Sequence, residues 1–260
     1  MKNTQYIPLI ILIIFICFLQ YSCKSEPEVT NDNDGIATDT THQLSHNSQL
    51  EKTNEVEFPE LLPINQIDQD PSLKKTIQQL KKIIQRKNVS GLKQYIDENI
   101  KIGFGTENGK TAFINHWNLN STDTDDSEIW QELNRILDLG GVFFNDNSFS
   151  MPYVFDHFPA NYDIFEFSAI TGENVHMREE PNLKGKILAS LSYEIVKLYA
   201  NEDNKMEEVN GEKYPWIKIM RTNNEVGYVY GKYVRSPSDY RIFLEKQNGK
   251  WIITTFLAGD

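Results

Sequence analysis

The loop from Gly105 to Thr111 has the residue types of a phosphate-binding loop. A strand-like run precedes it, and Lys110 and Thr111 open a helical pattern. Such a loop needs four residues between its two glycines, so that successive backbone amides point at a phosphate group. Gly105 leaves three residues before Gly109 and Gly103 leaves five. The spacing therefore does not predict nucleotide binding.

Acidic residues gather just before a second helical pattern, at Asp123, Asp125, Asp126 and Glu128. An EF-hand calcium loop needs a glycine at its sixth position, and the stretch 121–134 has none. Acidic side chains are favourable at the positive end of a helix dipole. We predict that these residues cap the start of a helix and bind no calcium.

The five histidines do not form a metal site in the sequence. His42 and His46 are four residues apart, but their surroundings lack a helical pattern and further ligands, and His116, His157 and His176 are isolated. Neither Gly-x-Ser-x-Gly nor His-Glu-x-x-His occurs. The sequence predicts no metal, no cofactor and no serine or zinc hydrolase.

The two cysteines lie near the amino terminus, at Cys17 and Cys23. Lys2 and the apolar run from Ile7 to Leu19 precede a polar stretch, and this run is shorter than the roughly 20 residues that span a bilayer. The pattern is typical of a secretory signal, which we assign to residues 1–22. The mature chain after Cys23 then has no thiol for disulfides, catalysis or metal binding.

The segment Leu19-Gln20-Tyr21-Ser22-Cys23 resembles a loose bacterial lipobox of Bacteroidetes type, although Gln20 stands where a large aliphatic residue is usual. The resemblance implies lipid attachment at Cys23 and an extracytoplasmic protein anchored to a bacterial membrane. Acyl chains on a cysteine can provide that anchor without a spanning helix. The following Lys24-Ser25-Glu26-Pro27-Glu28 resembles the export tag of surface lipoproteins, so the protein would face either the periplasm or the cell surface.

Composition sets two further expectations. Residues 23–67 are mostly polar and have one aromatic side chain, Phe58, so we predict a disordered tether there. The chain has a formal net charge of −11, which is unfavourable for neutralising phosphates. We therefore expect no nucleic-acid partner.

Residues 68–171 are predicted to form a helical α+β domain. Asp70 and Pro71 signal the start of a long amphipathic helix, and Ser90 is predicted to cap a short second helix whose apolar face includes Ile96. Further helices are expected from Lys110 to Trp117 and through Trp130, Leu133 and Leu137. Short strands are then expected at 142–144, 153–155 and 164–170.

Residues 238–260 are predicted to form a β-hairpin that packs on the helical domain. Asn248-Gly249 separates two runs rich in β-branched and aromatic residues, which is a strong hairpin signal. A two-stranded hairpin alone is marginally stable in water, so its apolar residues need a partner surface.

Residues 172–237 resemble the bacterial SH3 family, in five segments that follow the family's order. These segments are Asn174-Val175-His176-Met177-Arg178, Lys186 to Leu191, Ile195 to Tyr199, Trp216-Ile217-Lys218-Ile219 and Gly227 to Val234. The resemblance implies a small β-barrel that serves as a binding module. The chain departs from the family in two places: Tyr228 stands where Trp is usual, and a polar insertion occupies 201–212.

Arg178, Trp216, Tyr228 and Tyr230 are the candidate ligand-binding residues of the barrel. The Arg178 guanidinium could bind a ligand carboxylate, or it could bind Glu179, Glu180 or a backbone carbonyl within the domain. The aromatic residues could line a groove or form the barrel core, and we favour core for Trp216 and for Tyr233. Tyr228 and Tyr230 are two apart and share one face of a strand.

The part before the barrel resembles the amino-terminal part of Bacteroidetes SH3-containing lipoproteins, through Phe104-Gly105, Trp117, Leu139-Gly140-Gly141 and Pro152-Tyr153. The closing Gly249-Lys250-Trp251-Ile252-Ile253 resembles the end of nuclear-transport-factor-like cone folds. Together these resemblances give the expected fold class: an α+β chain in which a nuclear-transport-factor-like unit contains an inserted SH3-like β-barrel.

The expected function is that of a non-catalytic envelope lipoprotein that binds a peptide-like or peptidoglycan-related ligand, or an envelope protein. The alternative is an enzyme or small-ligand binder that uses a cavity in the cone-shaped helical domain. Its candidate acid and base residues are His116 and Asp138, and the sequence does not show whether they converge.

We predict that Cys23→Ser abolishes lipid attachment, because the Cys23 thiol is the expected acceptor and Cys17 lies within the signal. Metabolic labelling with a fatty acid measures this. Label retained by the Cys23→Ser protein would show that Cys23 is not the anchor.

Overall fold

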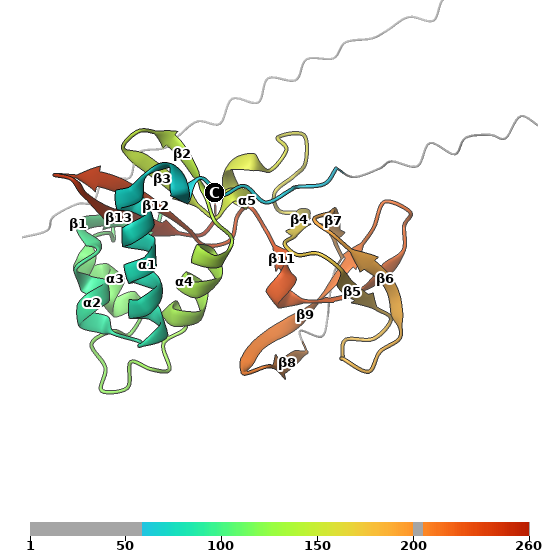
Figure 1. Ribbon diagram of the computed structural model, residues 1–260. Helices are drawn as coiled ribbons and strands as arrows, with labels where there is room; N and C mark the ends of the chain where they lie inside the picture. The colour runs from blue at the N-terminus through green and yellow to red at the C-terminus, as the bar shows by residue number, and fades with distance from the viewer. Residues whose placement is uncertain (1–58, 200–204, 260) are drawn as a thin grey trace, which may run out of the picture. The chain divides into compact units, whose positions relative to one another are not determined.

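The computed structural model describes residues 59–199 and 205–259, which form a mixed α+β structure with two β-sheets (Figure 1). The signal, Cys23, both tether histidines and most of the predicted tether lie outside the described residues. None of the helices in the described part is long and apolar enough to cross a membrane.

The first sheet has five strands in the order β1-β13-β12-β3-β2. Their bounds are β1 Ile96–Lys101, β2 Val142–Asn145, β3 Ser148–Met151, β12 Arg241–Gln247 and β13 Lys250–Leu257. Helices α1 Pro71–Gln85, α2 Val89–Lys93, α3 Lys110–His116 and α4 Ile129–Asp138 gather on one side of this sheet (Figure 1). A 3-10 turn, η1 Ile67–Gln69, precedes α1.

The start of α1 is confirmed where the sequence predicts it. The Asp70 carboxylate accepts hydrogen bonds from the backbone amides of Ser72 at 2.6 Å and Leu73 at 3.0 Å, and Pro71 occupies the first turn. Lys246 of β12 reaches the same carboxylate at 2.7 Å. Burial alone would raise the pKa of Asp70, but these hydrogen bonds to its charged form hold it well below its usual value. The cap thereby links α1 to the sheet.

Several local predictions were wrong. Asn88, not Ser90, caps α2 through its bond from the Gly91 amide at 3.0 Å, and Ile96 begins β1 instead of continuing the helix. The segment predicted as a strand at 153–155 is helix α5 Tyr153–His157.

The acidic residues before α4 also differ from the prediction. The helix begins at Ile129 after Glu128, and no side chain hydrogen-bonds to its first amides. Lys87 instead donates to the backbone carbonyl of Asp125 at 2.6 Å. The acids therefore lie in an exposed loop that is held through its backbone.

The closing hairpin supplies two adjacent inner strands of the first sheet. Asn248 and Gly249 have φ of 51° and 78°, as the predicted tight turn requires. β13 pairs with β1 in parallel, and β12 pairs with β3 in antiparallel. Apolar side chains of the hairpin therefore complete the main core.

The main core lies between this sheet and the helices, and apolar side chains fill it. Members of this core come from α1, from α3 and the residue after it, from α4, from β3 and from the hairpin: Leu73, Leu80, Phe113, Trp117, Trp130, Leu133, Phe149, Trp251 and Phe256. At about 1.5–3 kcal/mol for each large apolar side chain, this burial is the main source of stability for the unit.

The second sheet is built from the segment between β3 and β12. Its strands follow the order β11-β4-β7-β9-β10-β5-β6, and β8 pairs with β9 beside this path. Their bounds are β4 Phe167–Ile170, β5 Val175–Arg178, β6 Ile187–Leu191, β7 Ile195–Leu198, β8 Met206–Val209, β9 Glu212–Met220, β10 Val226–Tyr230 and β11 Val234–Arg235, with the 3-10 turn η2 Gly231–Tyr233 before β11.

The strands expected from the SH3 resemblance are present, but the expected closed barrel is not seen. The pairings form an open path, and among the described strands no pairing joins β6 to β11. The sheet also begins earlier than residue 172, because β4 pairs with both β7 and β11. A small apolar core lies within this part, formed by Ile170, Val175, Met177, Leu191, Val196, Ile219, Val229 and Val234.

The tether was predicted to extend to residue 67, but residues 59–67 already belong to the folded part of the chain. Leu61 and Ile67 are buried, and the Leu61 amide donates to the carbonyl of Tyr193 at 2.7 Å. The Gln66 amide donates to the Gly141 carbonyl at 2.9 Å. This strip therefore contacts both sheets before α1 begins.

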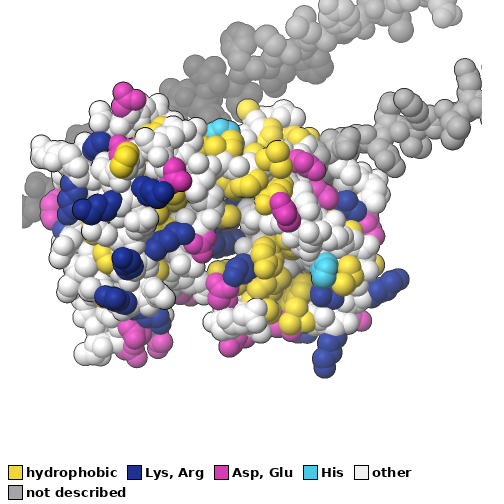
Figure 2. Space-filling model, viewed as in Figure 1, with side chains coloured by type: hydrophobic (Ala, Val, Ile, Leu, Met, Phe, Trp, Pro, Cys, Tyr) yellow, Lys and Arg dark blue, Asp and Glu magenta, His cyan; other side chains and the backbone are white. Residues whose placement is uncertain are grey.

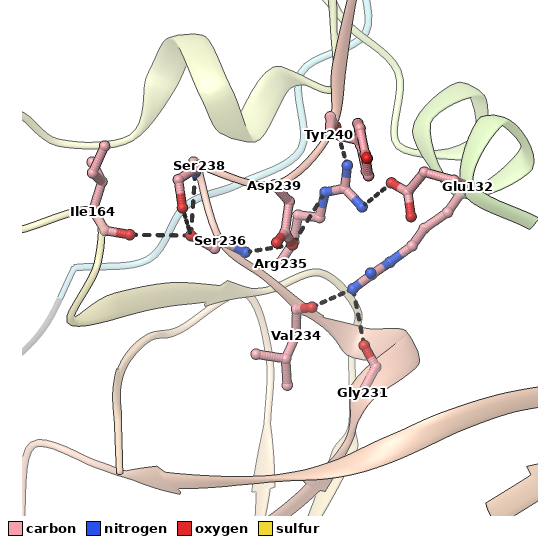
Figure 3. A network of polar contacts seen from close by, with 10 residues as sticks. Glu132, Ile164, Gly231, Val234, Arg235, Ser236, Ser238, Asp239 and Tyr240 are labelled. Atoms are coloured by element: carbon pink, nitrogen blue, oxygen red, sulfur yellow. Dashed lines mark hydrogen bonds and ion pairs between the residues drawn. The ribbon is translucent and has the colours of Figure 1, made fainter. Parts of the chain in front are cut away.

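A pair of arginines joins α4 to the end of the second sheet (Figure 3). Arg235 of β11 is 1% exposed, and it binds Glu132 of α4 at 2.7 Å and the backbone carbonyl of Tyr240. Arg135, one turn further along α4, donates to the carbonyls of Gly231 at 2.9 Å and Val234. Burial and the neighbouring Arg235 lower the pKa of Arg135.

We predict that Arg235→Met lowers the free energy of unfolding by about 3–5 kcal/mol, because it leaves Glu132 without its partner in a buried setting. The matched change Lys81→Met removes the exposed ion pair between Lys81 of α1 and Asp138 of α4, and it should cost at most about 1 kcal/mol. Urea denaturation measures both. Equal losses for the two variants would contradict a special role for Arg235.

Candidate binding groove

A cavity of about 330 Å³ lies at one end of the second sheet, and we call it the Tyr233 groove. Three chain segments form most of its wall: the turn into β5 at 172–176, the β8–β9 turn at 209–212, and η2. The remaining lining residues are Arg178, Leu183, Trp216 and Tyr230. In Figure 2, hydrophobic side chains gather over the second sheet beside charges of both signs.

Tight turns bring these segments together. Asn174 has a φ of 54°, and its amide donates to the Ser192 hydroxyl at 3.0 Å. Asn210 and Gly211 have φ of 54° and 81° between β8 and β9. Asn210-Gly211 lies within 201–212, where a polar insertion was expected, although the same dipeptide marks the turn of the closing hairpin.

Two predicted site residues, Trp216 and Tyr230, form the base of the groove and are almost fully buried. The Trp216 indole donates to the Glu207 carboxylate at 2.6 Å. The Tyr230 hydroxyl lies 2.6 Å from the Glu212 carbonyl oxygen and 3.1 Å from that of Glu207, and burial raises its pKa. Both side chains hold β8 against β9 and β10.

The apolar rim consists of Tyr233 and Leu183, which are 39% and 47% exposed. The expectation that Tyr233 belongs to the core was wrong, because the 3-10 turn η2 interrupts the strand alternation between Tyr230 and β11. Leu183, in the loop between β5 and β6, was not singled out in the sequence. No periodic pattern in the sequence marks either residue as part of a groove.

Arg178 lines the groove, but its guanidinium is engaged within the chain. It donates to the Gly185 carbonyl at 2.7 Å and lies 3.5 Å from the ring nitrogen of the exposed His176. Arg178 therefore holds the loop that carries Leu183. This contact with a backbone carbonyl is one of the two roles that the sequence left open.

Tyr228, the fourth predicted site residue, does not line the Tyr233 groove. It is half-buried, and the Lys218 ammonium lies 5.8 Å from its ring centre. The shared face of Tyr228 and Tyr230 thus does not place both rings in one cavity.

Charges of both signs surround the apolar rim. Lys232 forms an ion pair with Glu212, and the hydrogen bond between them raises the pKa of Lys232. Glu173 lies on the wall formed by the turn into β5. The groove therefore offers apolar contacts beside hydrogen-bond donors and acceptors. The charges on its wall are of both signs.

The candidate residues of the enzyme alternative have separate partners. The His116 ring nitrogen lies 3.3 Å from the Tyr240 hydroxyl, whereas Asp138 binds Lys81 at 2.7 Å and accepts from Asn134 at 3.1 Å. The structure does not bring His116 and Asp138 into one cavity. Within residues 59–199 and 205–259, no cluster of three or more His, Cys, Asp or Glu side chains is arranged to hold a metal.

Comparisons with known proteins add little. No family model matches the sequence, and a search of curated proteins found no match. Among solved structures, a chain whose printed name begins Rd1NTF2_05 is 11% identical, and the similarity covers 72% of this chain and 95% of that chain with a TM-score of 0.27. A likeness at this TM-score supports no conclusion.

We predict different stability effects for two tyrosines of the groove. Tyr230→Ala should lower the free energy of unfolding by about 3–5 kcal/mol, because it removes a buried ring and leaves a cavity. Tyr233→Ala should lower it less, by about 1 kcal/mol, because that side chain is 39% exposed and loses less buried area. Chemical denaturation measures both, and a large loss for Tyr233→Ala would mean that Tyr233 supports the fold.

Proposed function

We propose that the chain is a non-catalytic lipoprotein of the bacterial envelope, anchored through Cys23, that binds a peptide-like ligand in the Tyr233 groove. The observation that carries this proposal is the exposure of Tyr233 and Leu183 on the rim of a cavity of about 330 Å³. Ligand sites are typically concave and apolar with a few polar groups that fix orientation, and they begin at about this volume.

A peptide-like ligand suits the chemistry of this wall. An extended peptide has apolar side chains for Tyr233 and Leu183, and backbone donors and acceptors for the polar groups around them. Aromatic rings such as that of Tyr233 give large contact area at low entropic cost. A ligand with charges of one sign only would gain less binding energy, because Lys232 and Glu212 already neutralise each other.

Support for the family assignment comes from the strand order. The five segments that resemble the bacterial SH3 family fall on β5, β6, β7, β9, and β10 with η2, in that order. We infer that the second sheet is a divergent SH3-type module inserted into a nuclear-transport-factor-like unit formed by the helices and the first sheet. All strands of the second sheet indeed lie between β3 and β12 in the chain.

The non-catalytic assignment is favoured over the enzyme alternative by two features of the helical unit. Apolar side chains fill the space between its helices and sheet. Its two candidate acid and base residues, His116 and Asp138, are exposed and bind different neighbours.

The proposed partner is peptidoglycan or an envelope peptide or protein. A lipid on Cys23 would place the module outside the cytoplasm, on the periplasmic side or at the cell surface, where such ligands occur. The formal net charge of −11 is unfavourable for nucleic acid.

We predict that the chain is retained by insoluble peptidoglycan, and that Tyr233→Ala with Leu183→Ala weakens retention at least tenfold. Each side chain would contribute about 1–3 kcal/mol as an apolar anchor. The matched control is Tyr199→Ala with Ile187→Ala, since both residues are exposed on the second sheet and do not line the groove.

A co-sedimentation assay over a range of salt concentrations measures the retained fraction. The proposal predicts loss for the groove pair and full retention for the control pair. Absence of retention for the unchanged chain would remove peptidoglycan as the ligand, and equal loss for both pairs would remove the groove as the site.

A further inference from the structure

A row of four side chains crosses the face of the second sheet that is turned away from its small apolar core. The row consists of Arg178 of β5, Tyr228 of β10, Lys218 of β9 and Tyr199, which directly follows β7. Tyr228 is the cross-strand neighbour of both Arg178 and Lys218, and the Tyr199 amide donates to the Lys218 carbonyl at 3.0 Å. We call these four residues the Lys218 row.

The two cations of the row are held in place without a carboxylate partner. The Lys218 ammonium lies 4.8 Å from the ring centre of Tyr199 and 5.8 Å from that of Tyr228. Arg178 donates to the Gly185 carbonyl, which is an uncharged group. Within residues 59–199 and 205–259, neither cation forms an ion pair. Their positions are therefore fixed while their charges are not neutralised.

The two tyrosines add hydroxyl donors to the row. Tyr199 is 47% exposed, and Tyr228 is half-buried with a hydroxyl that is accessible to solvent. In the described part of the chain, neither hydroxyl has a hydrogen-bond partner. The row thus presents two charged donors and two hydroxyl donors on one exposed face.

Acidic side chains are missing from this part of the face. Where β9 pairs with β10 and β10 with β5, the alternation of side chains places only four other residues beside the row: Trp216, Met220, Val226 and Tyr230. Glu166 and Glu225, just before β4 and β10, form ion pairs with other basic residues. In a chain with 37 acidic and 26 basic residues, this face offers donors without a carboxylate.

The spacing of the two cations favours an extended ligand. Arg178 and Lys218 are separated by two strand spacings, about 10 Å, with Tyr228 between them. Carboxylates on alternate residues of an extended peptide lie on one side, about 7 Å apart along the backbone, and flexible glutamate side chains span the remaining distance. The tyrosine rings supply apolar contact area for such a segment.

We propose that the Lys218 row binds an acidic segment of a partner protein in an extended conformation, with carboxylates on alternate residues. One carboxylate binds Lys218, the next binds Arg178, and the tyrosine hydroxyls donate to them. Of the four residues only Arg178 also lines the Tyr233 groove. The proposal does not rest on the function proposed for that groove, because Lys218, Tyr228 and Tyr199 lie outside its wall.

The test is an NMR titration of the isotope-labelled full chain with two short peptides whose ends are blocked by acetyl and amide groups. One peptide alternates glutamate with glycine, and the other has glutamine in place of each glutamate. We expect the glutamate peptide to shift the backbone amides of 216–220 and 226–230 in a saturable manner, and the glutamine peptide to leave them unchanged. Equal shifts with both peptides, no saturable shift with the glutamate peptide, or the same shifts with inorganic phosphate at equal concentration would each overturn the proposal.

The variant Lys218→Gln should weaken binding of the glutamate peptide at least about threefold, the scale of one exposed charge pair, whereas Lys218→Arg keeps the charge and should bind nearly as the unchanged chain does. An unchanged melting temperature shows that Lys218→Gln is folded. The matched control is Lys75→Gln, because Lys75 is exposed on α1 and forms no ion pair in the described ranges. The control should bind as the unchanged chain does. Equal weakening by Lys218→Gln and Lys75→Gln would show that binding follows only the overall charge, and would overturn the proposal.

Discussion

The buried charge of Arg235 is the constraint on which the arrangement of the two sheets depends. A guanidinium that is 1% exposed must have anionic or carbonyl partners, because a lone charge in that setting is strongly destabilising. Glu132 on α4 and the Tyr240 carbonyl provide them, and these groups exist together only where α4 lies against β11 (Figure 3). Arg135 repeats the link one turn along the helix.

This joint also connects the Tyr233 groove to the helical unit. Arg135 binds the Gly231 carbonyl at the start of η2, the turn that places Tyr233 on the groove rim. Its guanidinium also lies 5.5 Å from the ring centre of Tyr214 in β9. The turn between β8 and β9 lines the Tyr233 groove. The joint and this hairpin thus help to fix the shape of the groove wall.

Local signals in the sequence predicted much of the fold. Asp70 with Pro71 marked the start of α1, and Asn248-Gly249 marked the closing turn, because each rests on short-range backbone chemistry. Predictions were wrong where contacts between distant segments determine the local structure. Ile96 fits a helical face but pairs with Ile253 in the sheet. Leu61 lies at the end of a mostly polar stretch, but it is buried in a cluster that includes Tyr153 and Ile195.

The candidate site was predicted less well than the fold, for a related reason. Sequence reasoning selects residue types, so it found Trp216, Tyr230 and Arg178, which line the groove but are engaged in internal hydrogen bonds. The exposure of a side chain in a turn depends on the backbone conformation of that turn. The sequence gives no sign that η2 exposes Tyr233 while Tyr230, three residues earlier, is buried.

The most direct measurement of the central claim is an NMR titration of the isotope-labelled chain with soluble peptidoglycan fragments. The account predicts shifts confined to the three segments of the Tyr233 groove, at 172–176, 209–212 and 231–233. Saturating shifts that leave these segments unchanged and fall elsewhere, or no shifts at all, would contradict it.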